Sequence, residues 1–167
     1  LYGDQQVHKF FYLGSMFRYD RPQAGRYREF HQFGVEVLGA VSPAADAEVI
    51  ALAYDLFQSL GLKDLSLHIN SIGDSICRPV YRKKLIEFFE ERKDHLCADC
   101  RERLYKNPLR ILDCKEEGCK TASEGAPEIT NYLCETCNEK FEAVKQYLSA
   151  LGIPYTIDSR LVRGLDY

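Results

Sequence analysis

The N-terminal part of the chain contains two stretches whose apolar positions predict β-strands. Residues 7–19 are rich in aromatic side chains. Residues 28–39 alternate with a period of two, and one face of this strand carries Arg28, Phe30, Gln32, Gly34, Glu36 and Leu38. Pro22 and Gly25 lie between the two stretches. The pattern therefore predicts a long antiparallel hairpin closed by the loop 20–27.

Beyond residue 42 the apolar spacing becomes helical. Ser42 can cap a helix that has Pro43 at its first position and ends at Gly61. The pattern further predicts a strand at 65–70, helices at 75–95 and 134–151, and a strand, a bend and the start of another strand over 155–167. We therefore expect an α+β fold. Its antiparallel core, 1–75 and 153–167, is interrupted by a mostly helical, cysteine-rich insertion domain at 76–152.

The composition is that of a packed globular protein. Hydrophobic residues make up 46% of the 167 positions and charged residues 28%, which excludes a disordered or collagen-like chain. No apolar run approaches the roughly 18 residues that span a bilayer, so we expect no membrane partner. The net charge of −3 argues against a domain whose main task is to grip nucleic acid. Met16 is the only methionine, which indicates an internal piece of a longer protein.

Seven cysteines without a signal-peptide pattern indicate a reducing compartment, the cytoplasm, where thiols bind metal or stay free. The close pairs, which let two sulfurs meet one tetrahedral ion, are Cys97/Cys100, Cys114/Cys119 and Cys134/Cys137. The simplest structural zinc site combines the two C-x2-C pairs, which are Cys97, Cys100, Cys134 and Cys137. The 33 residues between these pairs exceed a compact zinc ribbon, and reduced structural thiols are the alternative. We interpret Cys77, at the start of a helix, as unrelated.

The predicted hairpin combines cations with aromatic rings. Its sequence FRYDRPQAGRYREF contains Arg18, Arg21, Arg26 and Arg28. A guanidinium matches phosphate through a planar fork of donors, and an aromatic face can stack on a base. The alternative is a solvated hairpin whose arginines protect the sheet edge. Gln32 and Glu36 favour a binding site, because polar groups on an inner strand face are costly without a partner, although a structural salt bridge would also satisfy Glu36.

Two segments carry a resemblance to a known family. FRYDRPQAGRYREFHQFGVEVLG resembles motif 2 of the class II aminoacyl-tRNA synthetases in its histidyl form, and LVRGLDY resembles the histidine-specific motif of the histidyl-tRNA synthetases. NPLRILDCK and the separation of the motifs are similar to bacterial members of that family. The resemblance covers essentially the whole chain and implies part of the class II catalytic core with its insertion domain. Motifs 1 and 3 are absent from this chain, so the fragment alone is expected to be inactive.

The resemblance implies a set of ATP contacts. Arg18 would hold the α-phosphate, Phe30 would stack on adenine, and Arg26 would contact the distal phosphates. Asp20, where the family usually has Glu, would contact adenine. Arg163 would reach the α-phosphate from the opposite side, as a fixed cation in place of a metal ion.

The resemblance also implies a set of histidine contacts. Arg18 and Arg163 would bind the amino acid as well as the nucleotide and are the expected catalytic residues. Gln32 and Glu36 would bind the amino acid, with Glu36 recognising the imidazole. Tyr167 would line the histidine pocket.

The implied activity is activation of L-histidine with ATP and Mg²⁺, followed by transfer of the histidyl group to tRNA(His) in a homodimer. One alternative is the synthetase-like regulatory subunit of ATP phosphoribosyltransferase, which senses histidine and forms no adenylate. The intact Arg18 and RGLDY favour the enzyme. Another alternative is a zinc-dependent RNA-binding module over about 76–152, which leaves the hairpin unexplained. Residues 78–106 carry nine Lys or Arg against six Asp or Glu, which suits tRNA contacts or a solvated helical surface equally.

Overall fold

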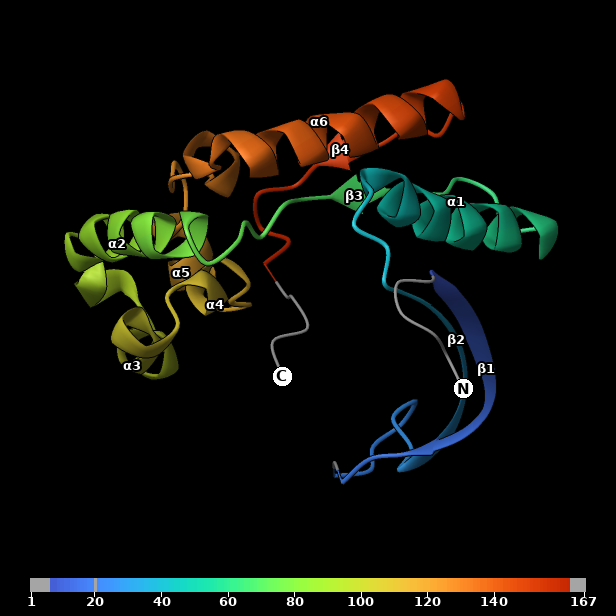
Figure 1. The fold of residues 1–167 in the computed structure, drawn as a ribbon. Coiled ribbons are helices and arrows are strands. Elements are labelled where there is room, and N and C mark those ends of the chain that lie inside the picture. Colours follow the sequence, from blue (N-terminus) through green and yellow to red (C-terminus); the bar gives the residue numbers. More distant parts are fainter. Residues whose placement is uncertain (1–6, 20, 163–167) are drawn as a thin grey trace. The chain divides into compact units, whose positions relative to one another are not determined.

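The computed structural model describes residues 7–19 and 21–162 (Figure 1). The contacts within the chain divide it into two compact units, Leu1–Leu62 and Lys63–Tyr167. Helices and strands occur in both units, so the expected α+β class is confirmed. No helix in the described part of the chain is long and apolar enough to cross a membrane.

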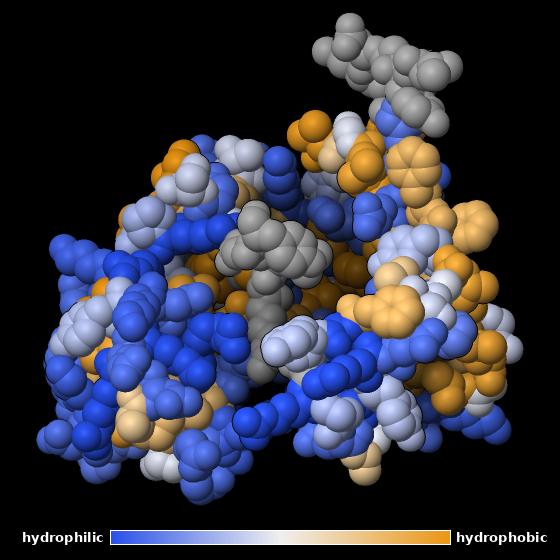
Figure 2. Space-filling model, turned by 90° about the horizontal axis from the view of Figure 1, so that it is seen from below, coloured by the Kyte–Doolittle hydropathy of each residue, from blue (hydrophilic) through white to orange (hydrophobic). Residues whose placement is uncertain are grey.

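The first unit begins with a curved two-stranded hairpin. β1 (His8–Phe17) pairs antiparallel with β2 (Glu29–Leu38), in a register that sets His8 opposite Leu38 and Phe17 opposite Glu29. Apolar residues form orange patches on the face shown in Figure 2. On β1, Phe11 and Leu13 are 81% and 76% exposed. A two-stranded sheet with such exposed apolar residues is only marginally stable on its own.

The loop of the hairpin closes through a tight turn. Gln23 and Arg26 exchange two backbone hydrogen bonds, of 3.2 and 2.8 Å. Gly25, inside this turn, has φ 74°, in the left-handed region that glycine adopts without strain. The predicted hairpin and its loop are therefore confirmed.

One helix completes the first unit. α1 (Pro43–Ser59) begins as the sequence predicts, because the Ser42 hydroxyl accepts the Ala44 N–H at 3.3 Å. Gly61, with φ 82°, reverses the chain after the helix.

α1 packs on one face of the hairpin. Lys9 of β1 forms an ion pair of 2.5 Å with Glu48 of the helix. Val35 and Val37 of β2 are half-buried and share a cavity with Val49 of α1. These strand residues have odd numbers, so the helix covers the face opposite the one that carries Phe30, Gln32 and Glu36.

The second unit contains one short parallel pair of strands. β3 (His68–Ile69) pairs with β4 (Thr156–Ile157), and the Asp158 N–H donates to the Ile69 carbonyl at 3.0 Å. Both strands are shorter than the sequence predicts. The pair joins residues that precede and follow the cysteine-rich segment, so the chain leaves and returns at the same place.

The segment between these strands is helical. Its elements are α2 (Cys77–Glu90), η1 (Lys93–His95), α3 (Ala98–Lys106), α4 (Leu109–Leu112), α5 (Glu117–Ala122), η2 (Ile129–Tyr132) and α6 (Glu135–Ala150). The core of the segment includes Tyr81, Leu85 and Phe89 of α2, all fully buried. The mostly helical character predicted for this part of the chain is confirmed.

The helix predicted at 75–95 is wrong at its C-terminal end, because α2 stops at Glu90. The Arg92 guanidinium donates to the Phe88 carbonyl at 3.0 Å and lies 3.8 Å from the centre of the Phe88 ring. This contact satisfies a carbonyl that the helix would otherwise use. The turn that follows buries Leu96, which is 2% exposed.

Candidate functional site

The hairpin register sets the expected ligand-binding residues in one row. Directly opposed residues of an antiparallel pair lie on the same face. The opposed pairs on the face away from α1 include Phe10–Glu36, Tyr12–Gly34, Gly14–Gln32 and Met16–Phe30. Arg18 continues this row, and its backbone N–H donates to the Arg28 carbonyl at 2.8 Å. We call the side of the hairpin that carries Arg18, Phe30, Gln32 and Glu36 the open face.

Arg18 is fixed by two contacts at one end of the open face. Its Nε donates to the Tyr27 carbonyl at 2.8 Å, and its guanidinium carbon lies 4.6 Å from the centre of the Phe30 ring. Among the described residues, its two terminal nitrogens make no hydrogen bond. The guanidinium is thus held in place with its fork of donors available to an anion.

Tyr12 organises the middle of the open face, and the sequence analysis did not identify it. Its hydroxyl accepts a hydrogen bond from Gln32 Nε2 at 2.9 Å. Its ring lies against the backbone of Gly34, where a side chain would overlap it. The strand register could have identified it. A register that pairs Gly14 with Gln32 also places Tyr12 opposite Gly34, which has no side chain.

Gln32 and Glu36 are both exposed, so the argument that they lie on an inner face is wrong for this structure. Within the described part of the chain, Glu36 makes no hydrogen bond or ion pair. The structural salt bridge that was one interpretation of Glu36 is therefore absent among these residues. The carboxylate is available to a ligand on the open face.

The loop of the hairpin is cationic and exposed. Arg21 and Arg26 lie in the loop and Arg28 lies directly before β2, all with exposed side chains. The rings of Tyr19 and Tyr27 are 98% and 67% exposed. A charged loop of this kind attracts polyanions such as phosphates.

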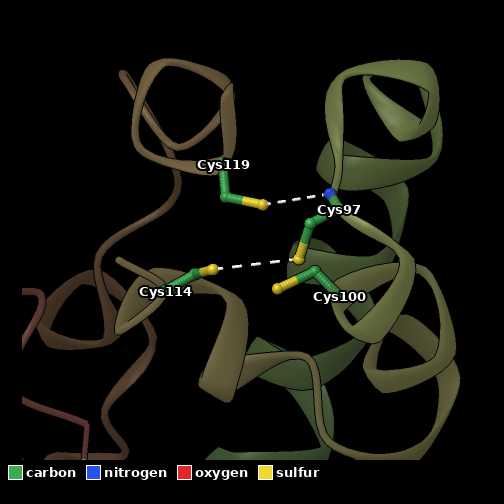
Figure 3. A group of neighbouring side chains, drawn as sticks. All are labelled: Cys97, Cys100, Cys114 and Cys119. Atoms are coloured by element: carbon green, nitrogen blue, oxygen red, sulfur yellow. Dashed lines mark hydrogen bonds between the residues drawn. The ribbon is translucent and has the colours of Figure 1, made fainter. Parts of the chain in front are cut away.

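The second unit gathers the cysteines into two groups. The first cysteine group consists of Cys97, Cys100, Cys114 and Cys119, and the Asp74–cysteine group consists of Asp74, Cys77, Cys134 and Cys137. In each group the potential ligand atoms lie within 4.8 Å of one another. Figure 3 shows the four sulfurs of the first group turned toward a common centre.

The two groups share a local design. Cys97 is the N-cap of α3 and Cys134 is the N-cap of α6, so each C-x2-C pair begins a helix. The Cys97 N–H donates to Cys119 Sγ at 3.2 Å, and the Cys134 N–H donates to Cys77 Sγ at 3.0 Å. In both groups the helix start therefore bonds a sulfur from a distant part of the chain.

Hydrogen bonding and burial shift the acidities in these groups in opposite directions. Backbone N–H bonds, from Cys77 first and then from Ile76, hold the pKa of Asp74 far below its usual value. The backbone N–H of Cys100 lowers the pKa of Cys97. Burial raises the pKa of Cys119 to about 11 and that of Cys137 to about 12.

Comparison with known proteins identifies the family. The model of the family described as Histidyl-tRNA synthetase matches residues 1–167. The chain belongs to the histidyl-tRNA synthetase family. It is 60% identical over its full length to a histidine–tRNA ligase of Desulforudis audaxviator, and 58% identical over 95% of its length to one of Desulforamulus reducens.

A solved structure supports the same membership. The chain superposes on apo histidyl-tRNA synthetase of S. aureus with a TM-score of 0.69 at 46% identity, over 95% of this chain and 36% of that one. The chain spans about two fifths of the curated relatives, 40% and 38% of those from D. audaxviator and D. reducens. The expected partial class II core of this family is thereby confirmed.

The structure brings together only part of the residue set expected from the histidyl-tRNA synthetase motifs. Arg18, Phe30, Gln32 and Glu36 lie on one face, and Arg26 lies in the adjoining loop. Asp20, Arg163 and Tyr167 lie outside the described residues.

The cysteine set expected for one zinc site is not brought together. Cys97 and Cys100 group with Cys114 and Cys119, whereas Cys134 and Cys137 group with Asp74 and Cys77. Cys77 is therefore not unrelated to the other cysteines. Spacing alone pairs the two C-x2-C motifs, but each motif lies at the start of its own helix and meets a different segment.

Proposed function

We propose that the full-length protein activates L-histidine with MgATP to form histidyl-adenylate and transfers the histidyl group to tRNA(His). The proposal rests on the arrangement of the open face, where Arg18 is fixed beside Phe30 and in line with Gln32 and Glu36. Family membership over the whole chain and the names of the relatives support it.

The adenylation step needs charge stabilisation and alignment more than proton transfer. A carboxylate oxygen of histidine bonds to the α-phosphorus while the bond from that phosphorus to its bridging oxygen breaks, and pyrophosphate leaves. Arg18 donates to the α-phosphate and to the attacking carboxylate, and so stabilises the charge that gathers between them. Arg163 acts on the same phosphate from the other side.

The nucleotide is held at the loop end of the open face. Phe30 presents its ring to the adenine, and stacking on an aromatic side chain accommodates the base without a groove. Asp20 contacts the adenine. Arg26 approaches the distal phosphates, which arrive with Mg²⁺ bound to them as part of the substrate.

The amino acid is held further along the same row. Gln32, oriented by the Tyr12 hydroxyl, binds histidine together with Tyr167. Glu36 accepts a hydrogen bond from an N–H group of the imidazole, which gives the site its preference for histidine. In the second reaction the ribose hydroxyl of the tRNA 3′ end attacks the histidyl carbonyl carbon and AMP leaves.

The organisation of the chain follows from the same proposal. Residues 1–75 and 153–167 belong to the catalytic core, and 76–152 form the insertion domain. β3 precedes residues 76–152 and β4 follows them, so the pairing of the two strands supports these boundaries. The full-length protein acts as a homodimer in the cytoplasm, and light scattering on that protein tests the dimer.

Amino-acid-dependent ATP–pyrophosphate exchange tests the activity. The full-length protein is expected to exchange pyrophosphate with histidine and with no other amino acid. Histidine binding without exchange would instead support the regulatory subunit of ATP phosphoribosyltransferase. The relatives from D. audaxviator and D. reducens are histidine–tRNA ligases, which favours the enzyme.

A further inference from the structure

We propose that the second unit holds two structural zinc ions, one in the first cysteine group and one in the Asp74–cysteine group. All seven cysteines of the chain belong to these two groups, four to the first and three to the second. The groups draw on different segments of the chain and share no ligand.

The sulfur positions of the first group suit one tetrahedral ion. Zinc–sulfur bonds of about 2.3 Å in a tetrahedral site separate the sulfurs by about 3.8 Å. Cys97 Sγ and Cys114 Sγ are 4.0 Å apart, and all four sulfurs lie within 4.8 Å of one another. All seven cysteines are free thiols, and 4.0 Å is about twice the length of a disulfide bond. Small side-chain movements would close this group on an ion.

The burial and convergence of the first group also favour a metal site over reduced thiols that only fill space in the core. Cys100 and Cys119 are fully buried. Cys97 and Cys100 come from the start of α3, Cys114 from the segment before α5, and Cys119 from α5 itself. Four sulfurs from three segments meet at one point, whereas free cysteines that pack as small apolar residues have no reason to converge.

The Asp74–cysteine group has a carboxylate in the fourth position. Asp74 Oδ1 accepts the N–H groups of Ile76 and Cys77, both at 2.9 Å. Its Oδ2 faces the sulfurs and lies 3.7 Å from Cys134 Sγ. One oxygen is thus held by the backbone while the other points into the group, and such outer hydrogen bonds orient metal ligands.

The shared design compensates the charge of bound thiolates. A zinc ion with four thiolates carries two negative charges, so donors to sulfur stabilise it. The Cys97 and Cys134 N–H groups donate to Cys119 Sγ and Cys77 Sγ. Both C-x2-C pairs also lie at the N-termini of helices of 9 and 16 residues, where the helix dipole favours anions.

Each ion would join segments that are distant along the chain. The first connects α3 to α5. The second connects residues 74–77, where the helical segment begins, to the start of its last helix, α6. Four protein ligands in each group leave no open position for a substrate, so both ions stabilise the insertion domain and take no part in chemistry.

The zinc content of the full-length protein and of two double variants tests the proposal. The wild-type protein, purified without chelator, is expected to contain two zinc ions per chain, as measured by inductively coupled plasma mass spectrometry. Cys97→Ser/Cys100→Ser and Cys134→Ser/Cys137→Ser are each expected to retain one, and the fourfold variant none. Thr121→Ala, an exposed change beside the first group, is the control and is expected to retain two. One ion or none in the wild type, or loss of all zinc from a double variant that remains folded, would overturn the proposal.

A measurement on the wild-type protein remains decisive if a double variant fails to fold. Thiol alkylation during a chelator titration, read out by peptide mass spectrometry, is expected to release the cysteines in two separate blocks. One block is Cys77, Cys134 and Cys137, and the other is Cys97, Cys100, Cys114 and Cys119. Simultaneous release of the two C-x2-C pairs as one block, or full reactivity without chelator, would contradict two separate zinc sites.

The carboxylate ligand provides a further test. Asp74→Cys in the full-length protein converts the second group into a four-thiolate site. With Co²⁺ in place of zinc, the thiolate-to-cobalt charge-transfer absorption is expected to be stronger in the variant than in the wild type. The expected ratio is eight to seven, the ratio of the numbers of thiolate ligands. An unchanged spectrum would remove Asp74 from the ligand set. These readouts do not depend on adenylate formation, so they stand or fall separately from the proposed activity.

Discussion

The ring of Tyr12 lies directly against the backbone of Gly34, its opposed residue across β1 and β2. The Tyr12 hydroxyl in turn holds the side-chain amide of Gln32 at 2.9 Å. A residue without a side chain in β2 thus fixes an aromatic ring in β1, and the ring fixes a polar group on the open face. The packing of Tyr12 on Gly34 is thereby coupled to the orientation of the Gln32 side chain.

Gly34→Ala in the full-length protein is expected to displace the Tyr12 ring. Overpacking of this kind costs about 1–3 kcal/mol of unfolding free energy, and the loss of the Gln32 contact raises the KM for histidine. Gly14→Ala is the matched control, because a Cβ at Gly14 meets nothing within 4 Å. Melting temperature and pyrophosphate-exchange kinetics check both variants. Equal behaviour of the two variants would show that the Tyr12–Gly34 contact is unimportant.

Tyr12→Phe removes only the hydroxyl that accepts from Gln32. We expect the KM for histidine to rise about fivefold, corresponding to about 1 kcal/mol for the hydrogen bond, while the KM for ATP stays unchanged. Tyr19→Phe is a control with an almost fully exposed ring. Exchange kinetics with each substrate varied in turn distinguish the two. A rise in the KM for ATP instead would place the Tyr12 hydroxyl in the nucleotide site.

Phe30→Leu is expected to weaken nucleotide binding selectively. Base–aromatic stacking contributes about 1–3 kcal/mol, so the KM for ATP rises by about 5- to 150-fold. Leucine keeps the strand apolar but loses the ring that Arg18 contacts at 4.6 Å, so kcat also falls. Phe11→Leu, on the opposite face, is the control. An unchanged KM for ATP would contradict the adenine position.

Tyr81→Phe tests how much a buried hydrogen bond in the core of the second unit contributes to stability. The Tyr81 hydroxyl donates to the Pro127 carbonyl at 2.9 Å, so its loss is expected to lower the unfolding free energy by about 0.5–1.5 kcal/mol. Burial raises the pKa of Tyr81 above its usual value of 10.0. The folded state therefore keeps this proton after the unfolded state has lost it, and stability falls as the pH rises above about 10.

The phenylalanine variant lacks this ionisation, so its stability is expected to fall less steeply between neutral and alkaline pH. Thermal unfolding of both proteins at pH 8 and pH 10.5 checks the difference. An equal loss of stability at alkaline pH in the two proteins would show that groups other than Tyr81 cause the loss.

The hairpin could be predicted from sequence because its signals are local. Alternation gave the faces of β2, and Ser42 with Pro43 gave the start of α1, since capping and periodicity act within a few residues. The motif resemblance then assigned Arg18 and Phe30, and the structure places them in contact.

The cysteine groups could not be predicted because their partners are far apart along the chain. Asp74 and Cys134 are 60 positions apart, and only the fold brings them together. The exposure of Gln32 and Glu36 was also missed, because alternation defines two faces but does not say which one a helix covers. In this structure Val35 and Val37, on the other face, line a cavity together with Val49 of α1.

The central claim is that the open face of the hairpin binds histidyl-adenylate. The most direct test is a crystal structure of the full-length protein with the non-hydrolysable analogue histidyl-sulfamoyl adenosine. We expect the adenine to stack on Phe30, and the sulfamoyl group to lie about 3 Å from the terminal nitrogens of Arg18. An analogue bound elsewhere, with Arg18 and Phe30 untouched, would contradict the account.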